Sequence, residues 1–119
     1  TTAGFPNLFM FYGPNTNNGS ILYFLECQAE YIVRKVLEMQ AAGIASIEVR
    51  QDVMDDYNVA MQRDINAIDA WRVPGSKYYR SASGRVVTQW PHNMSTYRAR
   101  TSTADMDAFL TAKAAQPGA

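Results

Sequence analysis

The sequence predicts a single α+β unit dominated by helix. Three observations support this class: a long apolar pattern at helical spacing that ends at a glycine, a second segment with a helical apolar stripe, and short apolar runs typical of strands. The chain has 119 residues, of which 47% are hydrophobic and 18% charged. It is long enough to bury a core and too apolar to be disordered, but too short for a two-domain enzyme.

The N-terminal segment predicts a strand, a loop and the start of a helix. Leu8 to Tyr12 reads LFMFY, an unbroken apolar run between turn-forming residues, which is typical of a strand buried on both faces of a parallel sheet. The following stretch, GPNTNNG at 13–19, consists of loop-forming residues. Ser20 is then placed to cap a helix.

The first predicted helix runs from Ile21 to Ala42. It ends at Gly43, which can adopt the left-handed conformation that closes a helix. Its first half is apolar nearly all round, so we expect that half to be buried. Glu30, Arg34 and Glu38 follow at four-residue spacing and predict an outer face in the second half. These charges exclude a membrane span.

The middle of the chain predicts a short strand and a second, amphipathic helix. Ser46 to Val49 has the composition of a strand, and Asp52 is placed to cap the helix. One face of that helix is expected to join the core because its apolar residues follow at steps of three and four. These residues are Met54, Tyr57, Met61, Ile65 and Ile68.

The last third predicts a β-hairpin and a C-terminal helix. After a break at Pro74-Gly75, residues from Tyr78 to Trp90 surround the turn SASG at 81–84, which indicates a hairpin. Ser102, followed three residues later by Asp105, resembles a capping box. We therefore expect a final helix that reaches about Ala115.

The neutral net charge hides an uneven distribution. Residues 1–69 carry nine acidic and four basic residues, whereas residues 70–104 carry six basic residues and no acidic one. Two interpretations remain open: the regions pack together, or the arginines hold an anion such as a nucleotide phosphate. Because aromatic residues interleave with the basic ones, a small nucleic-acid-binding module is an alternative, and a structural or oligomerisation domain is another.

Three single residues carry side chains with possible chemical roles: Cys27, His92 and Glu26. One cysteine and one histidine exclude a metal site of ordinary ligand spacing. Cys27 lies in the most apolar stretch and is expected to be buried, and an unpaired cysteine fits a reducing cytoplasm. His92 alone defines no catalytic triad. Glu26, within the apolar half of its helix, would need a partner.

Three segments resemble one enzyme family. GFPNLFMFYGPNTNNGS at 4–20 resembles the late part of the FAD-binding domain in Baeyer–Villiger-type flavin monooxygenases, and ECQAEYI at 26–32 continues the match. YYRSASGRVVTQWPHNMSTYRART at 78–101 and ADMDAF at 104–109 are similar to the C-terminal region of the hydroxyacetophenone-monooxygenase-like branch. The family's glycine-rich dinucleotide fingerprints are missing from these 119 residues.

The resemblance implies a C-terminal fragment of a larger α/β flavoprotein with two dinucleotide-binding domains. Residues 1–45 would be the terminal strand, loop and helix of the FAD-binding domain, and residues 46–119 its helix, hairpin and helix extension. The implied cofactor-binding residues are Gly13, Pro14, Asn15, Thr16, Asn17, Asn18, Ser20 and Ile21. No catalytic residue is implied within this chain.

The same resemblance implies the chemistry of the full-length parent. Such an enzyme uses FAD, NADPH and oxygen to insert one oxygen atom into a ketone or onto a heteroatom through a flavin peroxide. We expect the isolated chain to be inactive, to bind FAD weakly or not at all, and to self-associate. Its expected partner is the missing N-terminal part of its own polypeptide, in the cytoplasm and without a membrane or nucleic acid.

Overall fold

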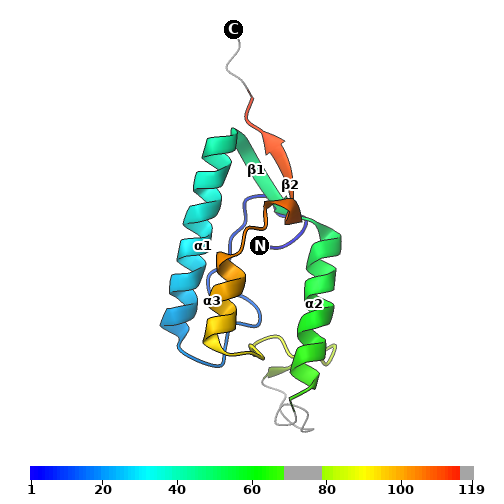
Figure 1. Ribbon diagram of the computed structural model, residues 1–119. Helices are drawn as coiled ribbons and strands as arrows, with labels where there is room; N and C mark the ends of the chain where they lie inside the picture. Colours follow the sequence, from blue (N-terminus) through cyan, green and yellow to red (C-terminus); the bar gives the residue numbers. More distant parts are fainter. Residues whose placement is uncertain (69–78, 116–119) are drawn as a thin grey trace.

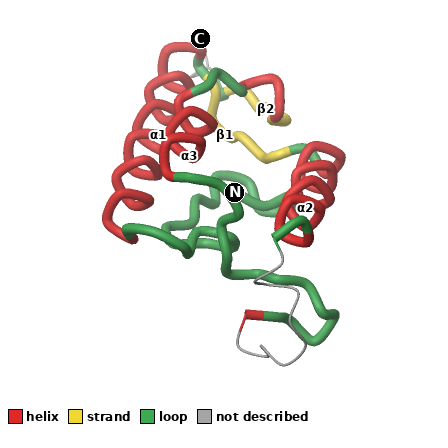
Figure 2. The backbone as a smooth tube through the Cα atoms, turned by 60° about the horizontal axis from the view of Figure 1, so that its bottom comes forward, coloured by secondary structure: helices red, strands yellow, loops and turns green. Residues whose placement is uncertain are grey.

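The computed structural model describes residues 1–68 and 79–115. Its elements are α1 (Ile21–Ala42), β1 (Ile44–Val49), α2 (Gln51–Asn66), α3 (Met94–Ser102), a 3-10 turn (Met106–Ala108) and β2 (Phe109–Lys113). Helices α1 and α3 lie side by side, whereas α2 lies on the other side of the N-terminal segment, residues 1–12 (Figures 1 and 2). This mixture of helix and strand agrees with the α+β prediction. No helix in the described ranges is long and apolar enough to span a membrane.

Helix α1 has the predicted bounds and caps. The Ser20 hydroxyl accepts a hydrogen bond from the Tyr23 amide at 3.4 Å, and Gly43 closes the helix with φ of 63°. The prediction that its first half is buried on all sides was wrong. Phe24 is fully buried, but Leu22 is 75% exposed because this chain covers only the face toward α3. Glu26 is exposed and needs no buried partner.

The predicted C-terminal helix was wrong, because residues Phe109–Lys113 form a strand. This strand, β2, pairs antiparallel with β1, with Val49 opposite Phe109 and Ile44 opposite Lys113. Pairing satisfies backbone groups of β1, and the buried Phe109 ring packs with Ile47 and Val49. A helix over the same residues would leave this edge of β1 unpaired.

The true helix of this region, α3, ends where the final helix was expected to begin. Asn93 caps its start, since its side chain accepts from the Thr96 amide at 2.8 Å. The Ser102 hydroxyl donates to the Arg98 carbonyl at 2.6 Å, one turn back. Ser102 therefore ends a helix, and Asp105 is engaged elsewhere.

Helix α2 begins one residue earlier than its predicted cap. Arg50 is the residue at its N-cap, and the Asp52 side chain pairs with the Arg50 guanidinium, so the prediction that Asp52 caps the helix was wrong. Of the predicted stripe, Met61 and Ile65 are buried, whereas Tyr57 is 47% exposed. The fully buried residues of α2 thus lie in its C-terminal half, while Met54 near its start is partly buried against Ile47, Val49 and Phe109.

The predicted strand at Leu8 to Tyr12 was also wrong. The segment is irregular, and Leu8, Phe11 and Tyr12 are exposed. Within the described residues, the sheet has two antiparallel strands, so no parallel neighbours exist for it. Single hydrogen bonds hold it instead, including one from the Tyr12 amide to Gln28 Oε1 at 2.8 Å.

The predicted hairpin is present in short form, since the Val87 amide donates to the Tyr79 carbonyl at 3.1 Å beyond the turn. Arg80 and Val86 form one antiparallel bridge, and the Ser81 amide donates to the Arg85 carbonyl at 2.8 Å. Gly84 has φ of 82°, which a glycine adopts without strain. The expected break at Pro74-Gly75 and the start of the hairpin at Tyr78 lie outside the described residues.

Two apolar clusters hold these elements together. The first joins α1, α2, α3 and the segment before α3, and contains Phe24, Cys27, Met61, Ile65, Val86, Trp90 and Tyr97. The second lies around the sheet and is built on Ile47, Val49 and Phe109. Cys27 is buried, as predicted. The loop that follows the N-terminal segment packs against the first cluster's Val86–Trp90 segment.

Candidate functional site

The loop at 13–19 runs beside residues 86–90 and is joined to them by main-chain hydrogen bonds. The amides of Asn15 and Asn17 donate to the carbonyls of Val87 and Thr88, both at 2.9 Å. The Trp90 amide returns a bond to the Asn17 carbonyl at 2.6 Å. The loop therefore has one defined shape, set by a segment more than 70 residues later in the chain.

Asparagine side chains reinforce this connection. The buried Asn15 amide donates to the carbonyls of Val86 and Gln89, each at 3.0 Å. Asn18 donates to the Trp90 carbonyl at 3.3 Å. These side chains are therefore engaged within the protein, as are the main-chain amides of Asn15 and Asn17.

The backbone of the loop requires the residue types found there. Asn15 and Asn18 have φ of 57° and 109°, in the left-handed region that asparagine tolerates better than most residues. Gly19 has φ of 152°, and a Cβ there would lie 2.5 Å from Met94 Sδ. The sequence pattern of Asn and Gly therefore reflects conformation and close packing.

The loop delivers the chain to an open helix N-terminus. The first turn of α1 contains no acidic residue, and Ser20, Ile21 and Leu22 are all exposed. The Tyr23 amide is used by the cap, but those of Ile21 and Leu22 have no acceptor within the helix. This end carries partial positive charge and suits an anionic or electron-rich group, so it fits the flavin that the resemblance implies.

The structure separates the eight implied cofactor residues into two groups. A pocket of about 370 Å³ lies between α1, α2 and the N-terminal segment, and Gly13, Pro14, Asn15 and Thr16 belong to its walls. Asn17, Asn18, Ser20 and Ile21 are not among its walls. The pocket is mostly apolar, with Gln28, Tyr31 and Asp105 among its polar residues.

A buried cation beside this pocket was missed from the sequence. Lys35 is fully buried, and its ammonium group pairs with Asp105 and with Glu38 Oε2, the latter at 2.8 Å. The Tyr31 hydroxyl donates to Asp105 Oδ2 at 2.7 Å. Burial raises the pKa of Tyr31 most, and the hydrogen bond to the Asp105 carboxylate raises it further. The spacing of Tyr31, Lys35 and Glu38 on one helical face was the available signal.

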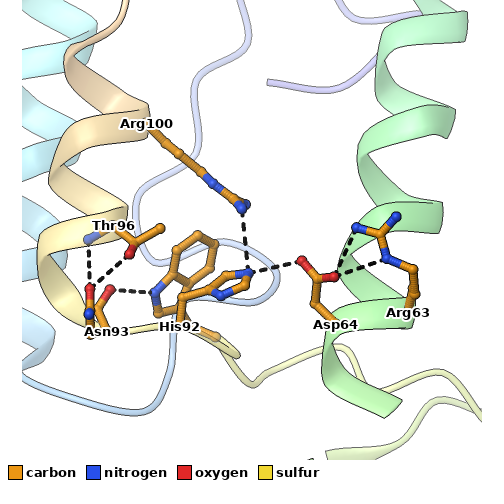
Figure 3. Close-up of polar contacts among 7 residues, drawn as sticks. Arg63, Asp64, His92, Asn93, Thr96 and Arg100 are labelled. Carbon is orange, nitrogen blue, oxygen red and sulfur yellow. Dashed lines mark hydrogen bonds and ion pairs between the residues drawn. The ribbon is translucent and has the colours of Figure 1, made fainter. Parts of the chain in front are cut away.

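A second polar cluster joins α2 to the start of α3 (Figure 3). His92 Nε2 lies 3.0 Å from Asp64 Oδ2 and 3.4 Å from an Arg100 nitrogen. A proton on Nε2 permits donation to Asp64 and excludes acceptance from Arg100. Partial burial favours protonation of Asp64, but hydrogen bonds from Arg63 and His92 outweigh it and lower its pKa.

The basic segment packs partly against the acidic one. Arg98 pairs with Glu30 at 3.0 Å, and His92 pairs with Asp64. Trp90 is fully buried and Tyr97 nearly so, with the Arg100 guanidinium 5.2 Å from the Trp90 ring centre. Neither ring offers the exposed face that base stacking requires. Trp71, Arg72, Lys77 and Tyr78 lie outside the described residues.

Known proteins similar to this chain are monooxygenases. A Baeyer–Villiger monooxygenase of Pseudomonas aeruginosa is 39% identical over 113 residues, covering 92% of this chain and 21% of that protein. Another from Streptomyces coelicolor is 30% identical, with 89% of this chain and 21% of the relative covered. The FAD-binding monooxygenase ktnD of Aspergillus niger is 27% identical, with 86% and 18% covered. No protein-family model and no solved structure matches significantly.

These relatives place the chain in the class of flavin-dependent monooxygenases. Within that class, the chain belongs to the Baeyer–Villiger and FAD-binding monooxygenase family, which confirms the resemblance. It spans about a fifth of the length of these curated relatives.

Proposed function

We propose that this chain is the C-terminal part of an FAD- and NADPH-dependent monooxygenase and that its N-terminal half completes the FAD site. Residues 1–45 would be the end of the FAD-binding domain, and residues 46–119 an extension that supports it. The observation that carries this proposal is the 39% identity to a Baeyer–Villiger monooxygenase across nearly the whole chain. The open start of α1 beside a loop of fixed shape supports it.

The loop and the helix start have distinct roles in this proposal. The main chain of residues 13–18 would line the flavin, while Ser20 and Ile21 present the N-terminus of α1 to it. The partial charge of that helix end stabilises negative charge nearby. FAD, when bound, supplies the redox chemistry with NADPH and oxygen by which one oxygen atom enters a ketone or adds to a heteroatom.

Exposed apolar side chains support the presence of further polypeptide. Leu22, Val33 and Leu37 are 75%, 58% and 59% exposed along one side of α1. The matched relatives have about four fifths of their length outside the aligned region. We propose that this additional polypeptide covers the exposed side of α1. The isolated chain would then be inactive, bind FAD weakly and self-associate.

The test uses the full-length gene product that contains this chain. We expect it to purify with FAD and to consume NADPH and oxygen when a ketone is added, with an ester or lactone as product. A full-length protein that binds no FAD would contradict the proposal. Titration of the isolated chain with FAD should show no micromolar binding, and micromolar binding would overturn the proposed need for the upstream part.

A further inference from the structure

We infer that Asn15 and Gln62 are positioning residues that set the shape of the 13–19 loop through one shared backbone carbonyl. Gln62 thereby acts on the loop from α2, although it is not among the walls of the pocket described above. The ligand, FAD, rests on the proposed function, but the hydrogen-bond relay is present in the protein itself. The relay is the path from Gln62 on α2, through the Val86 carbonyl, to Asn15.

The Val86 peptide group is held from both sides. Gln62 Nε2 donates to the Val86 carbonyl at 2.8 Å, and the Val86 amide donates back to Gln62 Oε1 at 3.1 Å. Asn15 Nδ2 donates to the same carbonyl at 3.0 Å. Both lone pairs of that oxygen are therefore used, one by α2 and one by the loop.

Burial makes these bonds strong determinants of position. Val86 is 2% exposed and Asn15 is 5% exposed, so water cannot readily replace either partner. The second hydrogen of the Asn15 amide donates to the Gln89 carbonyl at 3.0 Å. Loss of the Asn15 donors would remove this partner from the Gln89 carbonyl and leave Gln62 as the side-chain donor to the Val86 carbonyl, which favours a shift of the chain.

Asparagine at position 15 combines two properties: it adopts the required backbone conformation, and its side chain donates two hydrogen bonds. Its φ of 57° lies in the left-handed region, and its side chain supplies two donors. Glycine would keep the backbone conformation but lose both donors. Aspartate would keep the size but turn a carboxylate toward two carbonyl oxygens. These substitutions separate conformation from hydrogen bonding.

The side chain of Asn15 points toward residues 86–89, so its influence on a ligand is indirect. The relay fixes the main chain at 15–17 through the bonds from the Asn15 and Asn17 amides. Helix α2 holds Val86 from the other side, so a disturbance at Gln62 should reach the loop. Substitution of either Asn15 or Gln62 should therefore change the binding of a cofactor that lies against the loop's main chain.

The test is FAD affinity in the full-length protein, measured by quenching of flavin fluorescence. Asn15→Asp and Asn15→Gly should each weaken FAD binding about tenfold, and Gln62→Glu, which loses only the donor to Val86, about threefold. The exposed Asn66→Asp and Gln40→Glu are matched controls and should stay within about twofold. Affinity at the wild-type level in all three relay variants would overturn the inference.

Two further readouts separate positioning from general stability. The visible circular dichroism of bound flavin should change in Asn15→Gly, whereas a residue that acts only on stability would lower the melting temperature of the apoprotein and leave that spectrum unchanged. Should Asn15→Asp fail to fold, Gln62→Glu carries the same test.

If the wild-type protein binds no FAD, the proposed function fails, but amide exchange still tests the relay. Exchange at Asn15 and Asn17 should be at least tenfold faster in the Gln62→Glu variant, and an unchanged rate would refute it.

Discussion

The two faces of α1 differ in how completely this chain covers them. Toward α3, Phe24, Cys27 and Lys35 are essentially fully buried. On the other side, Leu22, Val33 and Leu37 remain more than half exposed. One side of α1 is therefore covered by its own chain, whereas the other side is apolar and exposed.

The contacts of the covered face are all made within residues 1–119, whereas contacts of the exposed face would require additional polypeptide. The covered face carries the contacts that hold α3 and the Val86–Trp90 segment, and with them the shape of the loop. The exposed face carries no such role within the described residues. A substitution on the covered face should therefore act in any context, whereas one on the exposed face should act only in the longer protein.

The largest effect is expected from Phe24→Ala. The ring is fully buried and contacts Tyr97 edge-to-face at 4.5 Å between centroids, so its loss should lower the free energy of unfolding by about 3–5 kcal/mol. Leu22→Ala is the matched control and should cost at most about 0.5 kcal/mol in this chain alone. In the full-length protein its cost should rise to about 2 kcal/mol. Urea denaturation measures each value, and equal effects in this chain would contradict the comparison.

A smaller loss is expected from Lys35→Met. It leaves Asp105 and Glu38 without their shared cation, but these carboxylate side chains are 32% and 34% exposed. The expected destabilisation is therefore about 2–3 kcal/mol, below that for a fully buried pair. Lys113→Met, on the exposed strand β2, should change stability by less than about 0.5 kcal/mol. Thermal unfolding of both variants checks this, and a Lys35→Met protein as stable as wild type would refute it.

Tyr31→Phe should cost about 1 kcal/mol near neutral pH, because it removes the hydrogen bond to Asp105. Burial raises the pKa of Tyr31 above its ordinary value of 10.0 in the folded state. Its contribution to stability is therefore complete below about pH 10 and is lost as the unfolded chain ionises above that value. The gap between wild type and variant should shrink in this range. A gap that widens there, measured by urea denaturation from pH 7 to 11, would contradict this assignment.

The smallest effect is expected from Asp64→Asn, at about 0.5–1 kcal/mol near neutral pH. Hydrogen bonds from Arg63 and His92 lower the pKa of Asp64 below its ordinary value of 3.8, against the effect of partial burial. The contribution is therefore present above about pH 4 and is lost as the pH falls further. Denaturation at pH 7 and pH 3 measures it, with the exposed Asp56→Asn as control. Equal losses for both variants at pH 7 would exclude the His92 pair as a stabilising contact.

The sequence was sufficient where the determinants are local. Both ends of α1 follow from residues within one turn: Ser20 caps the start, and Gly43 takes the left-handed conformation at the end. Strand β1 and the 81–84 turn were predicted for the same reason. The burial of Cys27 followed from its apolar neighbours.

The sequence was insufficient where a distant partner decides. Phe109 to Lys113 becomes a strand because β1 offers an edge about 60 residues earlier, and Leu8 to Tyr12 stays irregular because no parallel neighbours are present among the described strands. The loop was recognised, but its attachment to residues 86–90 was not. Asn15 reads as a turn former in sequence, and only the fold shows its two donors at Val86 and Gln89.

The most direct test of the central claim is amide hydrogen exchange of the full-length protein with and without FAD. If the loop and the start of α1 lie against the flavin, exchange at residues 13–21 should slow at least tenfold on binding, while the exposed residues 110–113 of β2 should be unaffected. Full occupancy by FAD with unchanged exchange at residues 13–21 would show that the cofactor lies elsewhere, and would contradict the account.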